Sequence, residues 1–255
     1  ALAGGVSLHL ATNLHNDVSD HIQGIDRYTD YGGAGVIQKG WLSARSVWFG
    51  ALTLYVLGVL CGLPLLWVRG ESLLVVGILG FIGASTYSLE NYGTKYSGLG
   101  DFSVFVLMGP LMALGTGIAA SGEWSWTLVL VSVPVGFFVA LILHGNNIHD
   151  IPIDRRAGAT TLAIVLGFQA SKTYYLLLLF GGYAAVGGLV VFDMAPVSPL
   201  LTGLTLPLAL RHFTIIREAQ NPLNPDLGKL RFRAARLHLL VGLLYVIGFM
   251  VPVVL

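Results

Sequence analysis

Two short stretches of the chain combine carboxylates with amides at helical spacing. In the first, Asn13, Asn16, Asp17 and Asp20 are spaced i, i+3, i+4 and i+7, so on a helix they share one face. No Lys or Arg stands between them, and Asp26 follows shortly after. Asp17 and Asp20 would repel each other unless a cation lay between them. The first stretch therefore predicts a cation-binding face.

The second stretch repeats this chemistry in the middle of the chain. Asn146, Asp150 and Asp154 are spaced i, i+4 and i+8, and Asn147 adds a second amide. Pro152 is expected to kink or end the helix, which would place Asp154 on the following loop. On its own, either stretch would also suit ordinary polar residues at a membrane surface.

Carboxylate and amide oxygens are the ligands that Mg²⁺ prefers in proteins. Magnesium typically takes one or two carboxylates and completes its shell with water and substrate phosphate. Two such clusters facing each other would hold a diphosphate between bridging ions. We therefore predict Mg²⁺ as the cofactor and assign metal-binding and catalytic roles to the four carboxylates Asp17, Asp20, Asp150 and Asp154.

Histidines stand beside both stretches. His15 and His21 are not spaced i, i+3 or i, i+4, so they do not share a helix face, and a dedicated centre of these residues with His149 is disfavoured. His9 and His144 are expected to be hydrogen-bonded interior groups and not catalytic ones.

The elements that must position these motifs are membrane helices. The chain has 255 residues, of which 55% are hydrophobic and 11% charged, whereas soluble domains carry about 25% charged residues. A net charge of +1 gives no basic field for nucleic acid, so no nucleic-acid partner is expected. The single cysteine, Cys61, excludes an internal disulfide.

Apolar runs predict the number of crossings, because a helix needs about 20 apolar residues to span the hydrocarbon core. Eight segments qualify or nearly do, which predicts an all-α polytopic bundle forming a single domain over residues 1–255. The segments are about 1–20, 44–68, 72–90, 101–121, 125–150, 171–192, 196–218 and 231–255.

The connections alternate between long polar loops and very short turns. All the Lys and Arg residues except Arg69 lie in or beside the long loops, which places those loops in the cytoplasm. Both motif helices then run inward and end at the cytoplasmic face. We expect a multi-pass protein of the cell inner membrane, in contact with lipid, whose active site faces the cytoplasm.

Further residues near the motifs are predicted to bind substrate. Cationic side chains on the cytoplasmic face would bind diphosphate oxygens, the amides would complete or orient the metal shell, and a tyrosine ring would stabilise a carbocation. For most of these cations and tyrosines, charge bias and core packing are the alternative explanations. The predicted substrate-binding residues are Asn13, Asn16, Asp26, Lys39, Tyr87, Lys95, Tyr96, Asn146, Asn147 and Arg155.

Several motifs in order resemble the UbiA superfamily of membrane prenyltransferases. The matching stretches are residues 13–26, 35–40, 96–101, 105–110, 146–158 and 161–167. They are most similar to the branch that prenylates 1,4-dihydroxy-2-naphthoate in menaquinone biosynthesis. Two positions depart from the pattern, since Gly24 replaces an Asp common in other branches and Ala159 replaces a common Lys.

This resemblance implies an intramembrane transfer of a polyprenyl group from polyprenyl diphosphate to an aromatic acceptor. In the naphthoate branch the acceptor loses its carboxylate during the transfer. The family has nine helices, so the eight predicted here imply that the first is missing from this sequence.

Two alternatives remain open at the level of sequence. The chain would also suit a non-catalytic structural, quinone-binding or lipid-binding subunit of a larger membrane complex. It would equally suit a sister prenyltransferase that uses 4-hydroxybenzoate or a chlorophyllide.

Overall fold

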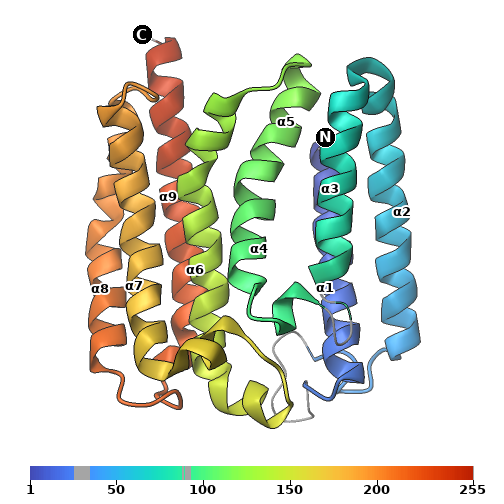
Figure 1. Cartoon of the computed structure of the whole chain (residues 1–255), viewed down its shortest axis with the longest axis vertical. Helices are drawn as coiled ribbons and strands as arrows, with labels where there is room; N and C mark the ends of the chain where they lie inside the picture. Colours follow the sequence, from blue (N-terminus) through green and yellow to red (C-terminus); the bar gives the residue numbers. More distant parts are fainter. Residues whose placement is uncertain (26–34, 88, 90–92, 255) are drawn as a thin grey trace.

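The computed structural model describes residues 1–25, 35–87, 89 and 93–254. In this part of the chain, long helices run roughly along one common axis (Figure 1). Their bounds are α1 Leu2–Ile22, α2 Ala44–Arg69, α3 Glu71–Tyr87, α4 Gly100–Val106, α5 Met112–Ser121, α6 Trp126–Arg156, α7 Leu162–Val191, α8 Leu206–Glu218 and α9 Leu230–Val254.

Shorter helical turns extend or join these helices. A π-helical turn, Leu107–Leu111, joins α4 to α5, and a 3-10 segment, Ser198–Thr205, precedes α8. Two further 3-10 turns are Thr94–Tyr96, before α4, and Leu227–Lys229, before α9. Counting α4 and α5 as one element, the described residues form eight long helical elements, which confirms the predicted all-α polytopic bundle.

Six of these elements are long and apolar enough to cross a membrane. The other two are α1, which contains the polar residues of the first motif, and α3, which has 17 residues. The chain is therefore a helical membrane protein, and α1, which carries the first motif, is one of the two elements outside the candidate membrane spans.

Two helix boundaries differ from the prediction around the second motif. Helix α6 continues through Pro152 to Arg156, so Asp154 lies on the helix, and the expectation that it lies on a loop was wrong. A proline this close to the end of a helix removes one backbone hydrogen bond, and only a few helical residues follow it. The element α7 begins at Leu162, earlier than expected, but it consists of two helices joined at Gly167, whose backbone angles (φ 75°, ψ 167°) are not helical, so the second helix begins close to the predicted segment.

The short turns and the long connections lie at opposite ends of the bundle (Figure 1). Arg69, at the end with the short turns, donates from Nε to the Ala119 carbonyl at 3.0 Å and from its guanidinium to the Ala120 carbonyl. These carbonyls belong to the last turn of α5, where a cation satisfies acceptors that the helix leaves unpaired. Arg69 therefore has a local structural role at this end of the bundle.

The largest core of the described residues surrounds α6. Phe138, Leu141, Ile148 and Tyr175 are almost fully buried there, together with Leu230 of α9. Helix α6 contacts α4, α7 and α9. Close approach to α7 is possible because Gly182 has no side chain, and a Cβ there would lie 2.7 Å from Phe138.

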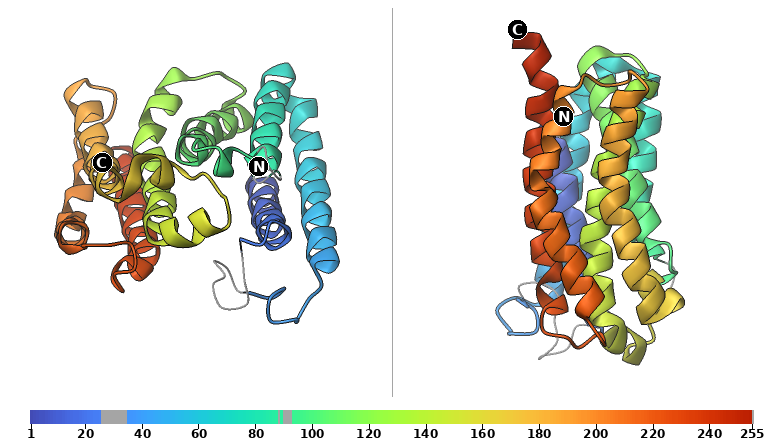
Figure 2. Two further views of the ribbon diagram at one scale, coloured as in Figure 1. Left: turned by 60° about the horizontal axis from the view of Figure 1, so that its bottom comes forward. Right: turned by 90° about the vertical axis from the view of Figure 1, so that its left-hand side faces the viewer.

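Helices α1, α2 and α3 form a second group, and α4 and α5 lie between it and α6–α9 (Figure 1). Helix α1 packs on α2, where a Cβ on Gly58 would lie 2.7 Å from Leu8 and 3.4 Å from the Gly4 carbonyl. The apolar cluster at the motif end of this pair is small, with Val18, Ile37 and Val47 as its buried members. Seen from the end of the bundle where the long connections lie, α1 and the C-terminal half of α6 face each other across the bundle (Figure 2).

Candidate active site

A cavity of about 730 Å³ lies between the two motif helices. Both predicted motifs line it, so the structure brings together residues that are more than 100 positions apart in the sequence. The predicted site residues on its surface are Asn13, Asn16, Asp17, Asp20, Tyr87, Lys95, Tyr96, Asn146, Asn147, Asp150 and Asp154.

One side of this cavity, the α1 wall, consists of Asn16, Asp17 and Asp20 of α1 with Lys95 and Tyr96 of the 3-10 turn. The Lys95 ammonium donates to the two Asp20 carboxylate oxygens at 2.8 and 3.0 Å, and the Tyr96 hydroxyl donates to the same carboxylate. Lys95 also donates to the Asn16 Oδ1 at 2.8 Å. Asp20 is buried, so these charge-assisted bonds compensate for its loss of water.

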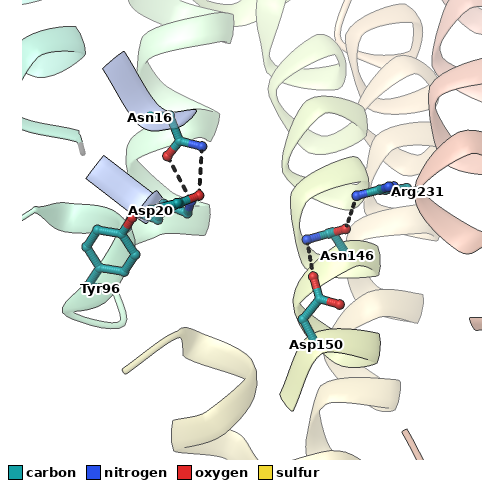
Figure 3. A network of polar contacts seen from close by, with 7 residues as sticks. Asn16, Asp20, Tyr96, Asn146, Asp150 and Arg231 are labelled. Atoms are coloured by element: carbon teal, nitrogen blue, oxygen red, sulfur yellow. Dashed lines mark hydrogen bonds and ion pairs between the residues drawn. The ribbon is translucent and has the colours of Figure 1, made fainter. Parts of the chain in front are cut away.

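The opposite side, the α6 wall, consists of Asn146, Asp150 and Asp154 of α6 with Arg231 of α9. Arg231 donates from Nη1 to the Asn146 Oδ1 at 2.9 Å, and Asn146 Nδ2 donates to Asp150 Oδ2 at 2.6 Å (Figure 3). The other Asp150 oxygen lies 2.7 Å from Nδ1 of His149. The carboxylate therefore has its orientation set from two sides.

A buried polar network extends from Asn147, which lines the cavity, into the packing between α4, α6 and α7. Asp101, in the first turn of α4, lies 2.5 Å from His144 Nδ1 and accepts from Asn147 Nδ2 at 3.2 Å. His144 Nε2 donates to the Ser171 carbonyl of α7 at 3.2 Å. Buried polar groups must find hydrogen-bond partners in an apolar bundle, and the bonds of this network connect α4, α6 and α7.

The two walls are also joined through the backbone. Ser97 directly follows the turn that carries Lys95 and Tyr96, and it forms an isolated parallel bridge with Thr160, just after α6. The segment that supplies the cation of the α1 wall is thus attached to the helix of the α6 wall.

Two predicted substrate-binding residues do not line the cavity, and a third lies outside the described residues. Asp26 lies outside the described residues. Lys39 does not line the cavity, and its ammonium lies 4.8 Å from the centre of the Trp41 ring. Arg155 is exposed near the end of α6 and is not part of the cavity lining either.

Of the two histidines that were expected to lie in the interior, only one is buried. His144 is fully buried and hydrogen-bonded, as predicted for an interior group. His9 is exposed on α1, so its placement in the interior was wrong. The face that packs on α2 carries Gly4, Leu8 and Ala11, and His9 lies off that face.

Sequence reasoning missed several residues of the cavity. Arg231 is the main one, since nothing in its local sequence distinguishes it from neighbouring arginines and it lies 85 positions from Asn146. Gly228 was also missed, and a Cβ there would lie 3.3 Å from the His149 ring. The remaining lining residues are polar Thr12, His149 and Thr161 and apolar Ile25, Ile142, Leu143 and Ile153.

The donor chemistry of the cavity fits magnesium that binds together with phosphate. Among the described residues, no group of three or more His, Cys, Asp and Glu side chains is arranged to hold a metal ion by itself. Magnesium does not require such a cage, because it usually takes one or two carboxylates plus water and substrate phosphate oxygens. Asp17, Asp20, Asp150 and Asp154 supply carboxylates from two sides, and Asn16 and Asn146 supply an amide on each side.

The arrangement combines two kinds of surface. Carboxylates, amides and two cations surround the polar part of the cavity, and Ile142 and Leu143 line it one turn before Asn146 along α6. Such a site suits an amphipathic ligand with a polyanionic head and an apolar body.

A family model described as the UbiA prenyltransferase family matches residues 1–234. The chain therefore belongs to the UbiA prenyltransferase family, which confirms the resemblance seen in the motifs.

Individual relatives point in the same direction. The chain is 34% identical to a 1,4-dihydroxy-2-naphthoate octaprenyltransferase of Mycobacterium tuberculosis over 83% of its own length and 71% of the relative's. It is 28% identical to the enzyme of the same name from Haemophilus influenzae, over 96% of this chain and 81% of that one. It is also 32% identical to UbiA prenyltransferase domain-containing protein 1 of Xenopus tropicalis, over 95% and 68%. No solved structure matches the chain.

Proposed function

We propose that this protein transfers a polyprenyl group from a polyprenyl diphosphate to 1,4-dihydroxy-2-naphthoate, in a Mg²⁺-dependent step of menaquinone biosynthesis. The observation that carries the proposal is that both carboxylate–amide motifs line one cavity. The naphthoate acceptor rests on the names of bacterial relatives that are 28–34% identical to this chain.

In this proposal the diphosphate head lies between the α1 wall and the α6 wall. Asp17 and Asp20 would hold magnesium on one side, and Asp150 and Asp154 on the other. When bound, the metal supplies neutralisation of the charge that develops on the leaving diphosphate. Lys95 and the amides of Asn16 and Asn146 keep the carboxylates in place before the substrate arrives.

The transfer breaks the bond between the allylic carbon and the diphosphate oxygen, and the electron pair leaves with the diphosphate. A carbon of the aromatic ring attacks the allylic carbon and forms the new carbon–carbon bond. The acceptor carboxylate then departs as CO₂, and its electron pair restores the aromatic ring. Enzyme groups accelerate this step by stabilising the charge that separates in the transition state.

The apolar lining would protect the reacting carbon from water. Ile142, Leu143 and Ile153 offer surface to the prenyl chain, and Tyr87 lines the same cavity. An aromatic ring face stabilises a nearby cation. Exclusion of water matters because water would capture the allylic cation before the acceptor did.

The test is an in vitro assay of the purified full chain with Mg²⁺, a polyprenyl diphosphate and a panel of aromatic acceptors. We expect prenylated product and CO₂ with 1,4-dihydroxy-2-naphthoate. Product with 4-hydroxybenzoate or a chlorophyllide instead would identify a sister enzyme. Absence of turnover with every acceptor, by protein that is folded and binds membranes, would favour the non-catalytic subunit and contradict the proposal.

We also propose that the cavity faces the cytoplasm in the inner membrane. The support is the gathering of basic residues at the end of the bundle where the long connections lie. Single cysteines at positions 160 and 223, introduced after Cys61→Ser, are expected to react with an impermeant thiol reagent only from the cytoplasmic side. Labelling from outside intact cells would reverse the orientation.

A further inference from the structure

The two walls of the cavity contain the same sequence of polar contacts. On the α6 wall, Arg231 donates to Asn146 Oδ1 at 2.9 Å, and Asn146 Nδ2 donates to Asp150 Oδ2 at 2.6 Å (Figure 3). On the α1 wall, Lys95 donates to Asn16 Oδ1 at 2.8 Å, and Asn16 Nδ2 donates to Asp20 Oδ2 at 3.2 Å. In each case the Asn and the Asp are four residues apart on one helix, and the cation comes from another segment.

This order follows from the chemistry of the amide. A cation offers only donors, so it can contact the Asn side chain only at the oxygen. The amide nitrogen must then point to the other side, where the Asp carboxylate lies one turn further along the helix. Each cation therefore fixes the orientation of its amide, and each amide fixes one carboxylate oxygen.

Arg231 and Arg233 are close in sequence, but their side chains have different surroundings. It lines the cavity, whereas Arg233 donates to the Asp226 carboxylate at 2.9 Å and is not part of the lining. A guanidinium carries five N–H donors in a planar fork, so it can hold Asn146 and a phosphate oxygen at the same time. A polyanion that entered between the walls would meet Lys95 on one side and Arg231 on the other.

We infer that Arg231 is a diphosphate-binding residue of the α6 wall, the counterpart of Lys95 on the α1 wall, and that it positions Asp150 through Asn146 before the substrate binds. The inference rests on the proposed function, because it takes a polyprenyl diphosphate as the substrate. It assigns a residue of α9 to the site and makes α9 the third helix that contacts the leaving group.

The experiment compares Arg231→Gln with Arg233→Gln in the purified full chain. Titration calorimetry measures the binding of inorganic pyrophosphate in the presence of Mg²⁺, and steady-state kinetics give separate KM values for the prenyl diphosphate and the acceptor. Loss of one hydrogen bond to a charged group costs about 1.5–3 kcal/mol, which corresponds to about 10-fold to 150-fold in affinity. We expect a loss of that size for pyrophosphate and the prenyl diphosphate, an unchanged KM for the acceptor, and no change in Arg233→Gln.

The outcomes separate the inference from the proposed function. If the wild type transfers the prenyl group and Arg231→Gln binds pyrophosphate as tightly as the wild type, the inference is overturned and the proposed function stands. If pyrophosphate binding depends on Arg231 but the wild type prenylates no acceptor, the anion site stands and the proposed function fails. If the Gln variant does not fold, Arg231→Met, which keeps an unbranched side chain next to Phe232, replaces it with the same expectation.

Discussion

The α1 wall and the α6 wall hold the same functional groups with different degrees of support. On the α6 wall, both the carboxylates and the cation come from long helices that pack against each other around the largest core. On the α1 wall, the cation comes from a 3-10 turn of three residues, and the apolar cluster beneath the helix is small. Rigid elements hold functional groups more accurately than connecting segments do. The comparison therefore predicts that the α6 wall is preformed, whereas the α1 wall depends on contacts made by Lys95 and Tyr96.

The largest expected effect tests what the two walls share. Asp17→Asn and Asp150→Asn each remove one negative charge from the proposed metal site, and each should lower kcat/KM by about 100-fold or more, the scale of losing one electrostatic contact to a transition state. Thermal unfolding in detergent should change little, because an amide replaces a carboxylate of the same shape. The control is Asp226→Asn, which lies outside the cavity lining and pairs with Arg233. Full activity of either site variant would refute its metal-binding role.

The next prediction distinguishes the α1 wall from the α6 wall by the change in melting temperature when the cation of each is removed. Lys95→Met removes the cation that bonds directly to buried Asp20 and leaves the carboxylate with fewer partners. Breaking a buried pair in this way costs about 3–5 kcal/mol of stability. We expect both activity and melting temperature to fall in Lys95→Met, whereas Arg231→Met should lower activity with a smaller change in melting temperature, since Arg231 reaches Asp150 through Asn146. Equal changes in melting temperature would show that the two walls do not differ in support.

A smaller effect on activity is expected from the buried network of Asp101, His144 and Asn147. Asp101→Ala removes the acceptor of His144 and Asn147 in the protein interior. Each buried donor left without a partner costs about 1–3 kcal/mol. The melting temperature should therefore fall, and activity measured well below it should decrease because Asn147 loses its orientation. Glu123→Ala, exposed at the far end of the bundle, is the matched control and should do neither.

The smallest expected effect tests the edge of the site. Arg155 was predicted from sequence to bind substrate, but the structure places it on the exposed surface outside the cavity lining. Arg155→Gln should therefore change kcat/KM by no more than about twofold, the range of ordinary surface substitutions. A loss of 10-fold or more would show that the site extends beyond the cavity described above.

Sequence reasoning succeeded where one helix carries the whole signal. The spacing of Asn13, Asn16, Asp17 and Asp20 predicts a shared face, and these four residues do line one cavity. The parity of crossings then predicts that the second motif ends on the same side, and this is also observed. Both inferences depend on local periodicity and on apolar segment length, which a single sequence contains.

The missed features depend on contacts between distant segments. The role of Asp101 was not predicted because its partners, His144 and Asn147, lie on another helix. Arg231 was missed for the same reason, since a basic residue beside a membrane helix is expected from charge bias alone. The extension of α6 past Pro152 was missed because the local rule for proline was applied without the tertiary contacts that support the helix end.

The π-helical turn at Leu107–Leu111 has a consequence for how the two groups of helices are joined. A π-turn is equivalent to an α-helix with one inserted residue, which rotates everything after it by about 100° relative to an unbroken helix. Before the turn, Asp101 and Phe105 face α6, and after it, Leu114 and Ile118 pack with Val76 of α3. Gly109 lies at the change itself, where a Cβ would come within 3.0 Å of Gly136. The inserted residue therefore sets the angle between the two contact faces of this membrane span, and removing one residue there would rotate one face relative to the other by about 100°.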